Sequence, residues 1–179
     1  MSEQQGKVWV VHVGEKGYQL PSINSQKGPF PPEPSTEGYI AIGWPAVGDM
    51  NLYENCYADY ISKFFKVYKD HNTQQANALW NFAFEIKEND WVISPSAATG
   101  YLLIGKIISG YIPNFHNDDL GFHKTIDEVY LHLHKVEWLY VIPKKDERYS
   151  KLNKYSPLTV SQYGFSIDEL KSILSTNQS

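Results

Sequence analysis

The sequence predicts an α+β domain in which helices flank a small, curved, barrel-like mixed β-sheet of about five or six strands. Three observations support this prediction. Short segments rich in β-branched and aromatic residues recur along the chain, and two amphipathic stretches with helical periodicity follow the second of them. Gly105 interrupts a later apolar segment, which indicates a bulge or bend where a barrel-like sheet curves.

The chain is expected to form a single domain over residues 1–179. This length suffices for a buried core, and a composition of 42% hydrophobic and 20% charged residues is typical of a globular protein. The termini are polar. A proline-rich loop is expected over 14–37, because the four prolines between positions 29 and 34 remove amide donors and block regular structure.

The periodicity of the apolar residues places the other elements. Strands are expected at 7–13, 38–44, 90–94, 101–108 and 129–140, and helices at 54–70, from Asn72 towards Asn89, and at 167–174. Asn72 and Gln75 form a capping-box pattern, and Ser166 is positioned to begin the last helix. Asn89 is expected to end its helix in a left-handed conformation.

The last long strand changes its pattern partway. Leu131 and Leu133 share one face, whereas Val136 and Trp138 fall on the other. A slip of one residue reverses the two faces of a strand, so a bulge is predicted near His134 or Lys135. A lysine-rich turn is expected over 143–154.

The charge of the chain limits how it could bind nucleic acid. The net charge is −4, the pI is near 5.8, and Arg148 is the only arginine. Tight non-specific binding to phosphates normally requires a surplus of basic residues, because released counterions supply the affinity. The composition therefore argues against such binding, and it leaves open the recognition of one base in a pocket.

The beginning of the chain and its cysteine content bear on the cellular compartment. Met1–Gly6 is polar and lacks the basic and apolar parts of a secretory signal, and no apolar run approaches the roughly 18 residues that cross a bilayer. Cys56 is the only cysteine, so an internal disulfide is excluded. A cytoplasmic protein without a membrane association is expected.

The histidines and the cysteine do not form a recognisable catalytic or metal pattern. His132 and His134 lie two residues apart, and His116 and His123 precede them, but zinc sites need three or four ligands with defined spacing. Cys56 has no partner nearby in the sequence, and there is no Gly-x-Ser-x-Gly motif or phosphate-binding glycine loop. We expect no metal, no cofactor and no catalytic residue, with the histidines in the core or on the surface.

The order of short motifs is more informative than any one of them. They are Trp9, Gly-Tyr-Ile-Ala-Ile-Gly-Trp at 38–44, Gly-Asp at 48–49, Phe-Glu-Ile-Lys-Glu-Asn-Asp at 84–90, Val-Ile-Ser-Pro-Ser at 92–96, Ile-Gly-Lys-Ile-Ile-Ser-Gly-Tyr at 104–111 and His-Lys-Val-Glu-Trp at 134–138. Over residues 7–143 this order resembles the EVE and YTH branch of the PUA-like superfamily, in particular the reader domains of McrB-like and Mrr-like modification-dependent restriction enzymes.

The resemblance implies a PUA-like fold with a pocket that holds one methylated or otherwise modified base, flipped out of the nucleic acid, in an aromatic cage. The Trp that relatives carry at the end of the second strand matches Trp44, and the aromatic residue after the outgoing strand matches Tyr111. The third wall is less regular among relatives and is assigned to Trp80, Tyr18 or Phe115. For any single aromatic residue the alternative is packing in the core.

Such a pocket can select a modified base by simple physical means. A buried methyl group is worth about 0.8 kcal/mol, and stacking a base on an aromatic ring contributes about 1–3 kcal/mol. Ser94, Ser96 and Asp49 are the candidates for reading the polar edge of the base. Lys144 and Lys145 belong to the only local basic cluster, which either contacts phosphates beside the pocket or forms a solvated surface.

These inferences favour a non-catalytic reader of a modified base in DNA. Its expected partners are modified DNA and a nuclease or AAA+ motor subunit of a restriction or defence system. One alternative is an RNA-binding module with the same fold. The other is a nucleotide or RNA hydrolase that uses the histidines, with His134 as the residue to test.

Overall fold

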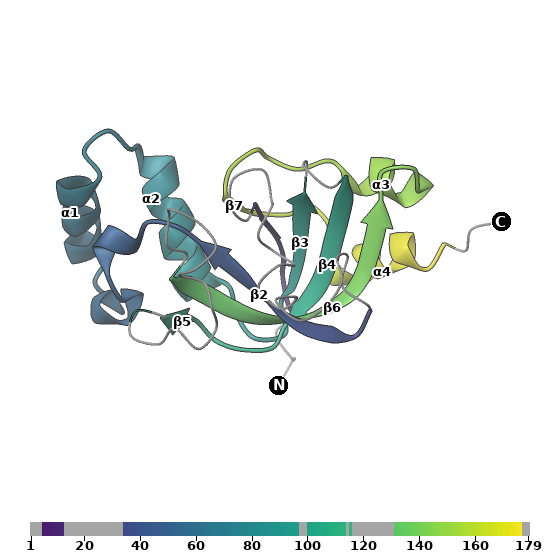
Figure 1. The fold of residues 1–179 in the computed structure, drawn as a ribbon, viewed down its shortest axis with the longest axis horizontal. Coiled ribbons are helices and arrows are strands. Elements are labelled where there is room, and N and C mark those ends of the chain that lie inside the picture. Colours follow the sequence, from purple (N-terminus) through teal and green to yellow (C-terminus); the bar gives the residue numbers. More distant parts are fainter. Residues whose placement is uncertain (1–4, 13–33, 97–99, 114, 116–130, 177–179) are drawn as a thin grey trace.

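The computed structural model describes residues 5–12, 34–96, 100–113, 115 and 131–176, and it shows a mixed α+β fold (Figure 1). The strands form a seven-stranded sheet in the order β2-β6-β4-β3-β1-β7, with β5 paired to β6. The sheet is therefore larger than the five or six strands expected. Among the described strands no pairing joins β2 to β7, so the sheet is curved but open rather than closed into a barrel.

The sheet combines one parallel pair with antiparallel pairs. β1 (Val8–Val11) is parallel to β3 (Trp91–Ser96), and β7 (Val160–Gln162) is antiparallel to β1 at the edge. β4 (Tyr101–Ile107), β6 (His132–Pro143) and β2 (Thr36–Ile42) continue the sheet on the other side as antiparallel neighbours. The short β5 (Ile112–Pro113) pairs with the first residues of β6. β7 was not predicted from the sequence.

The bulge predicted at Gly105 is confirmed. The register between β4 and β6 shifts between Ile104 and Gly105, because Ile104 faces Tyr140 whereas Gly105 faces Trp138. A Cβ atom on Gly105 would lie 2.5 Å from Val136 Cγ2 and 2.7 Å from the carbonyl oxygen of Glu137. Only glycine fits this close approach of the two strands.

The bulge predicted near His134 or Lys135 is wrong. β2 pairs with β6 without interruption from Trp138 to His132. The single register shift between β4 and β6 has its extra residue, Leu139, on β6, opposite Ile104 and Gly105 of β4. In the sequence, the apolar residues change from one strand face to the other before Leu139 is reached. They do so because Leu133, His134 and Val136 are all buried, which means that both faces of the strand are covered in this region.

Two helices connect β2 to β3. α1 spans Tyr57–Val67, and α2 spans Thr73–Trp80 and continues as the π-helix η5 (Asn81–Glu85). The capping box of Asn72 and Gln75 is confirmed, with the Asn72 side chain accepting from the Gln75 amide at 3.0 Å. Asn89 is left-handed as predicted (φ 75°), but it lies in the turn before β3, after the helix has already ended. No helix in the described ranges is long and apolar enough to cross a membrane.

The C-terminal region adds α3 (Glu147–Leu152) and α4 (Ile167–Leu174). Ser166 begins α4 as predicted, and it forms a capping box with Glu169. The turn predicted over 143–154 contains a short helix instead, because the Asp146 side chain accepts from the Arg148 amide and caps it.

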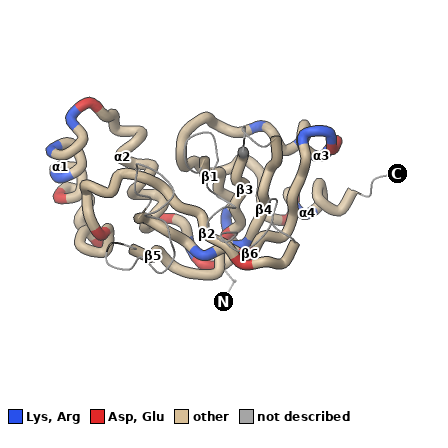
Figure 2. Tube along the Cα trace, in the orientation of Figure 1, with Lys and Arg blue, Asp and Glu red and all other residues tan. Residues whose placement is uncertain are grey.

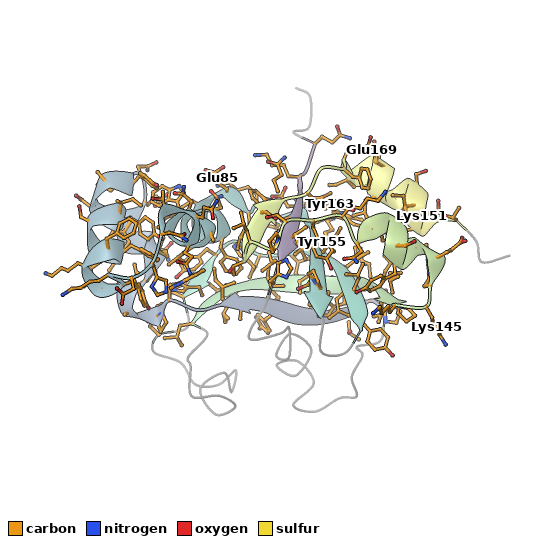
Figure 3. All side chains as sticks on the ribbon, turned by 90° about the horizontal axis from the view of Figure 1, so that it is seen from above. Glu85, Lys145, Lys151, Tyr155, Tyr163 and Glu169 are labelled. Carbon is orange, nitrogen blue, oxygen red and sulfur yellow. The ribbon has the colours of Figure 1, made fainter. Side chains whose placement is uncertain are left out.

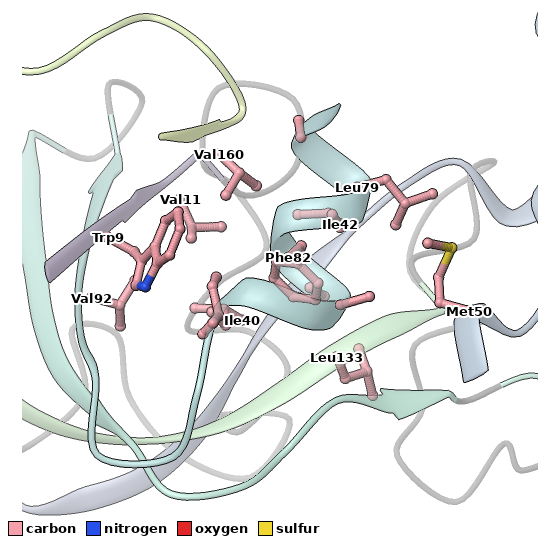
Figure 4. Packing of buried hydrophobic residues seen from close by; sticks show 14 of the residues in the cluster. Trp9, Val11, Ile40, Ile42, Met50, Leu79, Phe82, Val92, Leu133 and Val160 are labelled. Carbon is pink, nitrogen blue, oxygen red and sulfur yellow. The ribbon is translucent and has the colours of Figure 1, made fainter. Parts of the chain in front are cut away.

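The sheet separates two hydrophobic cores. Trp9 and Val11 of β1 face one core, whereas Val8 and Val10 face the other, as the alternation of side chains along a strand requires. The first core, part of which Figure 4 shows, packs the sheet against α1, α2 and η5. The second core packs the opposite face against α3 and α4 through residues such as Leu152 and Leu170. Helices therefore cover both faces of the sheet.

Candidate functional site

Trp44 lies just past the end of β2 in a strained conformation. The predicted strand over 38–44 ends at Ile42, and Trp44 adopts φ 64° and ψ 49° before the 3₁₀ helix η3 (Pro45–Val47). A left-handed backbone costs a residue with a Cβ atom roughly 1–2 kcal/mol. A bulky residue keeps such a conformation only where its surroundings hold it, and such residues cluster at functional sites.

Three hydrogen bonds link Trp44, His132, Tyr111 and Met50 into one group. His132 Nε2 lies 3.2 Å from the Trp44 carbonyl oxygen, and His132 Nδ1 lies 2.7 Å from the Tyr111 hydroxyl. The amide of Met50 donates to the same hydroxyl at 3.3 Å. A carbonyl oxygen only accepts, so Nε2 of the neutral His132 ring carries the proton and donates it to Trp44, and Nδ1 accepts the proton of the Tyr111 hydroxyl.

Aromatic rings surround His132. The Tyr111 ring stacks on it with centroids 5.8 Å apart and an interplanar angle of 28°, and the Phe115 ring meets it edge-on at 5.3 Å. Trp44, Tyr111 and Phe115 are half-buried, whereas His132 is buried. We call the group of Trp44, Asp49, Tyr111, Phe115 and His132 the Trp44 site.

Asp49 brings a negative charge to the edge of this group. It caps the 3₁₀ helix η4 (Met50–Tyr53), where its carboxylate accepts from the Asn51 amide at 2.9 Å. Burial lowers the pKa of His132 to about 4, against smaller opposing effects of the Trp44 carbonyl and the Asp49 charge. Burial raises the pKa of the Tyr111 hydroxyl, and the Asp49 charge raises it slightly further. Both rings are therefore neutral at physiological pH.

The other nominated wall and edge residues lie elsewhere. Trp80 packs between α1 and α2 against Tyr57, Tyr60 and Phe84, with centroid distances of 5.0, 5.4 and 4.4 Å. The Ser94 side chain is buried in the sheet and donates to the Val11 carbonyl at 2.6 Å.

Two nominated side chains cannot be placed. Ser96 ends β3, but its side chain lies outside the described residues, and so does Tyr18. Of the three candidates for the third wall, the structure brings only Phe115 together with Trp44 and Tyr111.

The predicted phosphate contacts are far from the Trp44 site. His132 is the first residue of β6, whereas Lys144 and Lys145 follow its last residue, Pro143. Twelve residues of β-strand span up to about 40 Å. Lys145 lies at the end of the molecule opposite α1 (Figure 3). These lysines therefore do not border the aromatic rings.

The histidines and the cysteine have local partners. His134 is buried, with Nε2 2.6 Å from the Phe82 carbonyl of η5 and Nδ1 3.2 Å from the Ser109 carbonyl. Cys56 is exposed, and its thiol donates to Asp59 at 3.0 Å. Within the described ranges, which exclude His116 and His123, no group of three or more His, Cys, Asp or Glu side chains could hold a metal ion.

A separate hollow of about 240 Å³ lies between α2 and the segment before β7. It is lined by Asn72, Gln74, Gln75, Ala78, Pro157, Leu158 and Thr159. Because its lining contains no aromatic ring, it is unsuited to stacking a base, and the Trp44 site remains the candidate for that role.

Sequence reasoning missed the part played by His132, which was assigned to the core or the surface. A signal was available in the pattern, because His132 and His134 occupy one face of a strand whose other residues on that face, Val136 and Trp138, are apolar. A polar residue repeated on a buried face needs a hydrogen-bond partner. The identity of that partner, 88 positions away, is visible only in the fold.

Comparison with known proteins gives a family but no function. Residues 22–162 match the family described as a domain of unknown function, DUF8426. No curated protein and no solved structure matches the chain.

Proposed function

Because the chain belongs to the DUF8426 family, whose function is unknown, we propose a function from its own site: a non-catalytic reader that binds one modified, methylated base of DNA at the Trp44 site. The observation that carries this proposal is the grouping of three half-buried aromatic residues at one buried, neutral histidine: the rings of Tyr111 and Phe115 pack against His132, and Trp44 is bonded to it through its backbone carbonyl. Rings that are neither buried nor free in solvent can stack on a flat ligand, and every nucleobase offers a flat face for such stacking.

At this site the free energy gained by stacking a base can offset the free energy needed to extrude it from a duplex. Extruding a base from a duplex costs a few kcal/mol, and less when the base is modified or in a single strand. Stacking contributes about 1–3 kcal/mol per ring, and a buried methyl group about 0.8 kcal/mol. Two or three rings therefore offset the cost of extrusion. The methyl group supplies only a modest preference, so discrimination must also come from the edge of the base.

Asp49 is the residue suited to reading that edge. Its carboxylate carries a full charge and accepts hydrogen bonds only, and one of its oxygens is already engaged by the Asn51 amide. The remaining oxygen matches an exocyclic amino group, which cytosine, adenine and guanine possess and thymine does not. We therefore expect a modified base other than a thymine derivative as the ligand.

The same proposal includes the superfamily of the fold and the cellular role of the domain. We assign the curved sheet, bent at Gly105 and flanked by helices, to the PUA-like superfamily, within its EVE and YTH branch. The order of motifs from Trp9 to Trp138 supports this assignment. In that setting the domain supplies specificity to a nuclease or an AAA+ motor of a restriction system in the cytoplasm.

The alternatives differ in what they require of the histidines. A hydrolase would need His132 or His134 to exchange protons with a substrate, but both are buried and both ring nitrogens of each lie against protein groups. Binding of RNA places no such demand, because the same rings stack on bases of either nucleic acid. RNA is therefore the second candidate ligand.

Gel-shift titration with matched oligonucleotides tests the proposal. DNA and RNA strands carrying 5-methylcytosine, 5-hydroxymethylcytosine, N6-methyladenine or no modification are compared at one salt concentration. We expect a preference for one modified form, and Trp44→Ala should weaken binding of that form about tenfold or more because base stacking on the indole ring is removed. An undiminished preference in Trp44→Ala would show that the cage is wrong. Cleavage abolished by His134→Ala would favour the hydrolase.

A further inference from the structure

We propose that His132 is the positioning residue of the Trp44 site: by donating Nε2–H to the Trp44 carbonyl, it holds the left-handed backbone that presents the indole ring to a base. This inference rests on the proposed function in so far as it concerns the base. The underlying link between His132 and the Trp44 backbone is a property of the free protein, and it can be tested without any ligand.

Among the residues that the structure describes, the Trp44 carbonyl has one strong partner. The Val47 amide approaches it at 3.5 Å, at the limit of a hydrogen bond, whereas His132 Nε2 lies at 3.2 Å and comes from a rigid strand. The Trp44 ring itself meets the Phe64 ring edge-on, with centroids 6.3 Å apart. The imidazole is therefore the side chain best placed to fix the carbonyl direction and, with it, the conformation of Trp44.

The imidazole is itself fixed from both sides. Tyr111 donates to Nδ1, which assigns the proton to Nε2, and the rings of Tyr111 and Phe115 pack against the imidazole. Asp49 is the charged group near this ring. One side chain thus touches all three aromatic residues of the Trp44 site, either directly or through a backbone carbonyl. Changing it should alter the geometry of the cage without removing any ring that contacts the base.

Two substitutions test the two ring nitrogens of His132 one at a time. The amide of His132→Gln reaches the position of Nε2 and keeps a donor for the Trp44 carbonyl, whereas the shorter His132→Asn reaches only Nδ1 and keeps an acceptor for Tyr111. His134→Gln is the matched control, because His134 is buried on the same face of β6 and its ring nitrogens lie next to two carbonyls, neither of them that of Trp44.

The first experiment uses the free proteins. Nitrogen chemical shifts in NMR report the tautomer of His132, which we expect to carry its proton on Nε2. The Trp44 contribution to near-ultraviolet circular dichroism is obtained as the difference between each protein and its Trp44→Phe counterpart. It should be retained in His132→Gln and His134→Gln and disappear in His132→Asn. An unchanged signal in His132→Asn would overturn the link to Trp44.

The second experiment measures affinity for the oligonucleotide that the wild-type protein prefers, at a temperature where every variant is folded. His132→Gln and His134→Gln should bind within about threefold of wild type, whereas His132→Asn should bind more than about tenfold more weakly, the effect of removing a buried hydrogen bond. Equal affinities for His132→Gln and His132→Asn would overturn the positioning role. A wild-type protein without any preference would instead contradict the proposed function, while the spectroscopic result would still decide the link.

Discussion

The two ends of β6 differ in how regular they are. Around Pro143 the strand is covered by α3 and α4, which are capped by Asp146 and Ser166 and fill the core with aliphatic side chains such as Leu170. Around His132 the covering residues are mostly aromatic, and the backbone departs from regular geometry at Trp44 and in the π-helix η5. Sequences depart from local rules chiefly at functional sites, so the contrast supports the proposal that the His132 end binds the ligand.

The irregular end also contains polar groups that only the fold satisfies. The π-helix leaves the Phe82 carbonyl without a helical donor, because the Lys87 amide donates to Asp90 instead, and His134 fills the gap at 2.6 Å. His132 does the same for Trp44. At the regular end, the helix caps are satisfied by residues within three positions, as in the capping box of Ser166 and Glu169. The regular end also has a long-range bond, from Arg148 Nη1 to the Leu174 carbonyl at 3.1 Å. What distinguishes the irregular end is that two buried histidines bond its backbone carbonyls.

Truncating one core residue at each end should give the largest effects. Phe64→Ala is expected to lower the free energy of unfolding by about 3–5 kcal/mol, and Leu170→Ala by about 2–5 kcal/mol, because both side chains are fully buried. Urea denaturation measures both. Only the change at Phe64, whose ring contacts Trp44, should also weaken base binding.

The milder Phe64→Leu keeps this comparison available if Phe64→Ala does not fold. Base binding reduced equally by Leu170→Ala in its folded form would remove the functional distinction between the two ends.

The pH dependence of stability should be the next largest effect. The ordinary pKa of histidine is near 6.5, and burial lowers that of His132 to about 4, so the unfolded chain binds a proton more readily. The contribution of neutral His132 is complete above pH 6.5 and declines as the pH falls towards 4. It amounts to about 3 kcal/mol at about 1.4 kcal/mol per pH unit.

Denaturation between pH 7 and pH 4 measures this decline, and the difference between wild type and His132→Gln isolates it. His134 and His12 also have lowered pKa values and remain in both proteins. Identical pH profiles for the two proteins would show that His132 is accessible to protons in the folded state.

Features set by neighbouring residues were predictable from the sequence. The capping boxes at Asn72 and Ser166 depend on residues three positions apart, and the bulge at Gly105 on the absence of one side chain. β7 was missed because its three residues, Val160–Gln162, are too few to show a period. A bulge near His134 or Lys135 was wrongly predicted because the burial of both strand faces imitates a change of register.

The candidate site was predictable only in part. The order of motifs identified Trp44 and Tyr111, which the fold brings into one hydrogen-bonded group through His132. Trp80 was nominated on equal terms with Phe115, because a sequence does not show which of two rings lies between packed helices. Lys144 and Lys145 were predicted to contact phosphates because they cluster in the sequence. The strand β6 separates them from the rings, and its length is known only once the strands are paired.

The smallest expected effect concerns two groups of lysines, on α1 and on the turn before α3 (Figure 2). α1 carries Lys63 and Lys66, with Lys69 just beyond its end. A hydrogen bond holds the end of α1 close to Trp44: the Ala46 amide donates to the hydroxyl of Tyr68, the C-cap residue of α1, at 2.9 Å. Electrostatic interactions are screened beyond about 10 Å at 0.1 M salt, so a short strand bound at Trp44 should sense the lysines of α1 more than those at the far end of β6.

Salt titration of binding compares the two groups directly. Lys63→Gln, Lys66→Gln and Lys69→Gln combined should flatten the plot of log affinity against log salt by about 0.7 for each phosphate of a single strand that these lysines neutralise. Lys144→Gln with Lys145→Gln should leave the slope unchanged for a short oligonucleotide centred on the modified base. The preference for that base should survive in both variants, because phosphates carry no information about base identity. A flatter slope in the second variant alone would mean that the strand runs along β6 towards α3, and that the regular end takes part in binding.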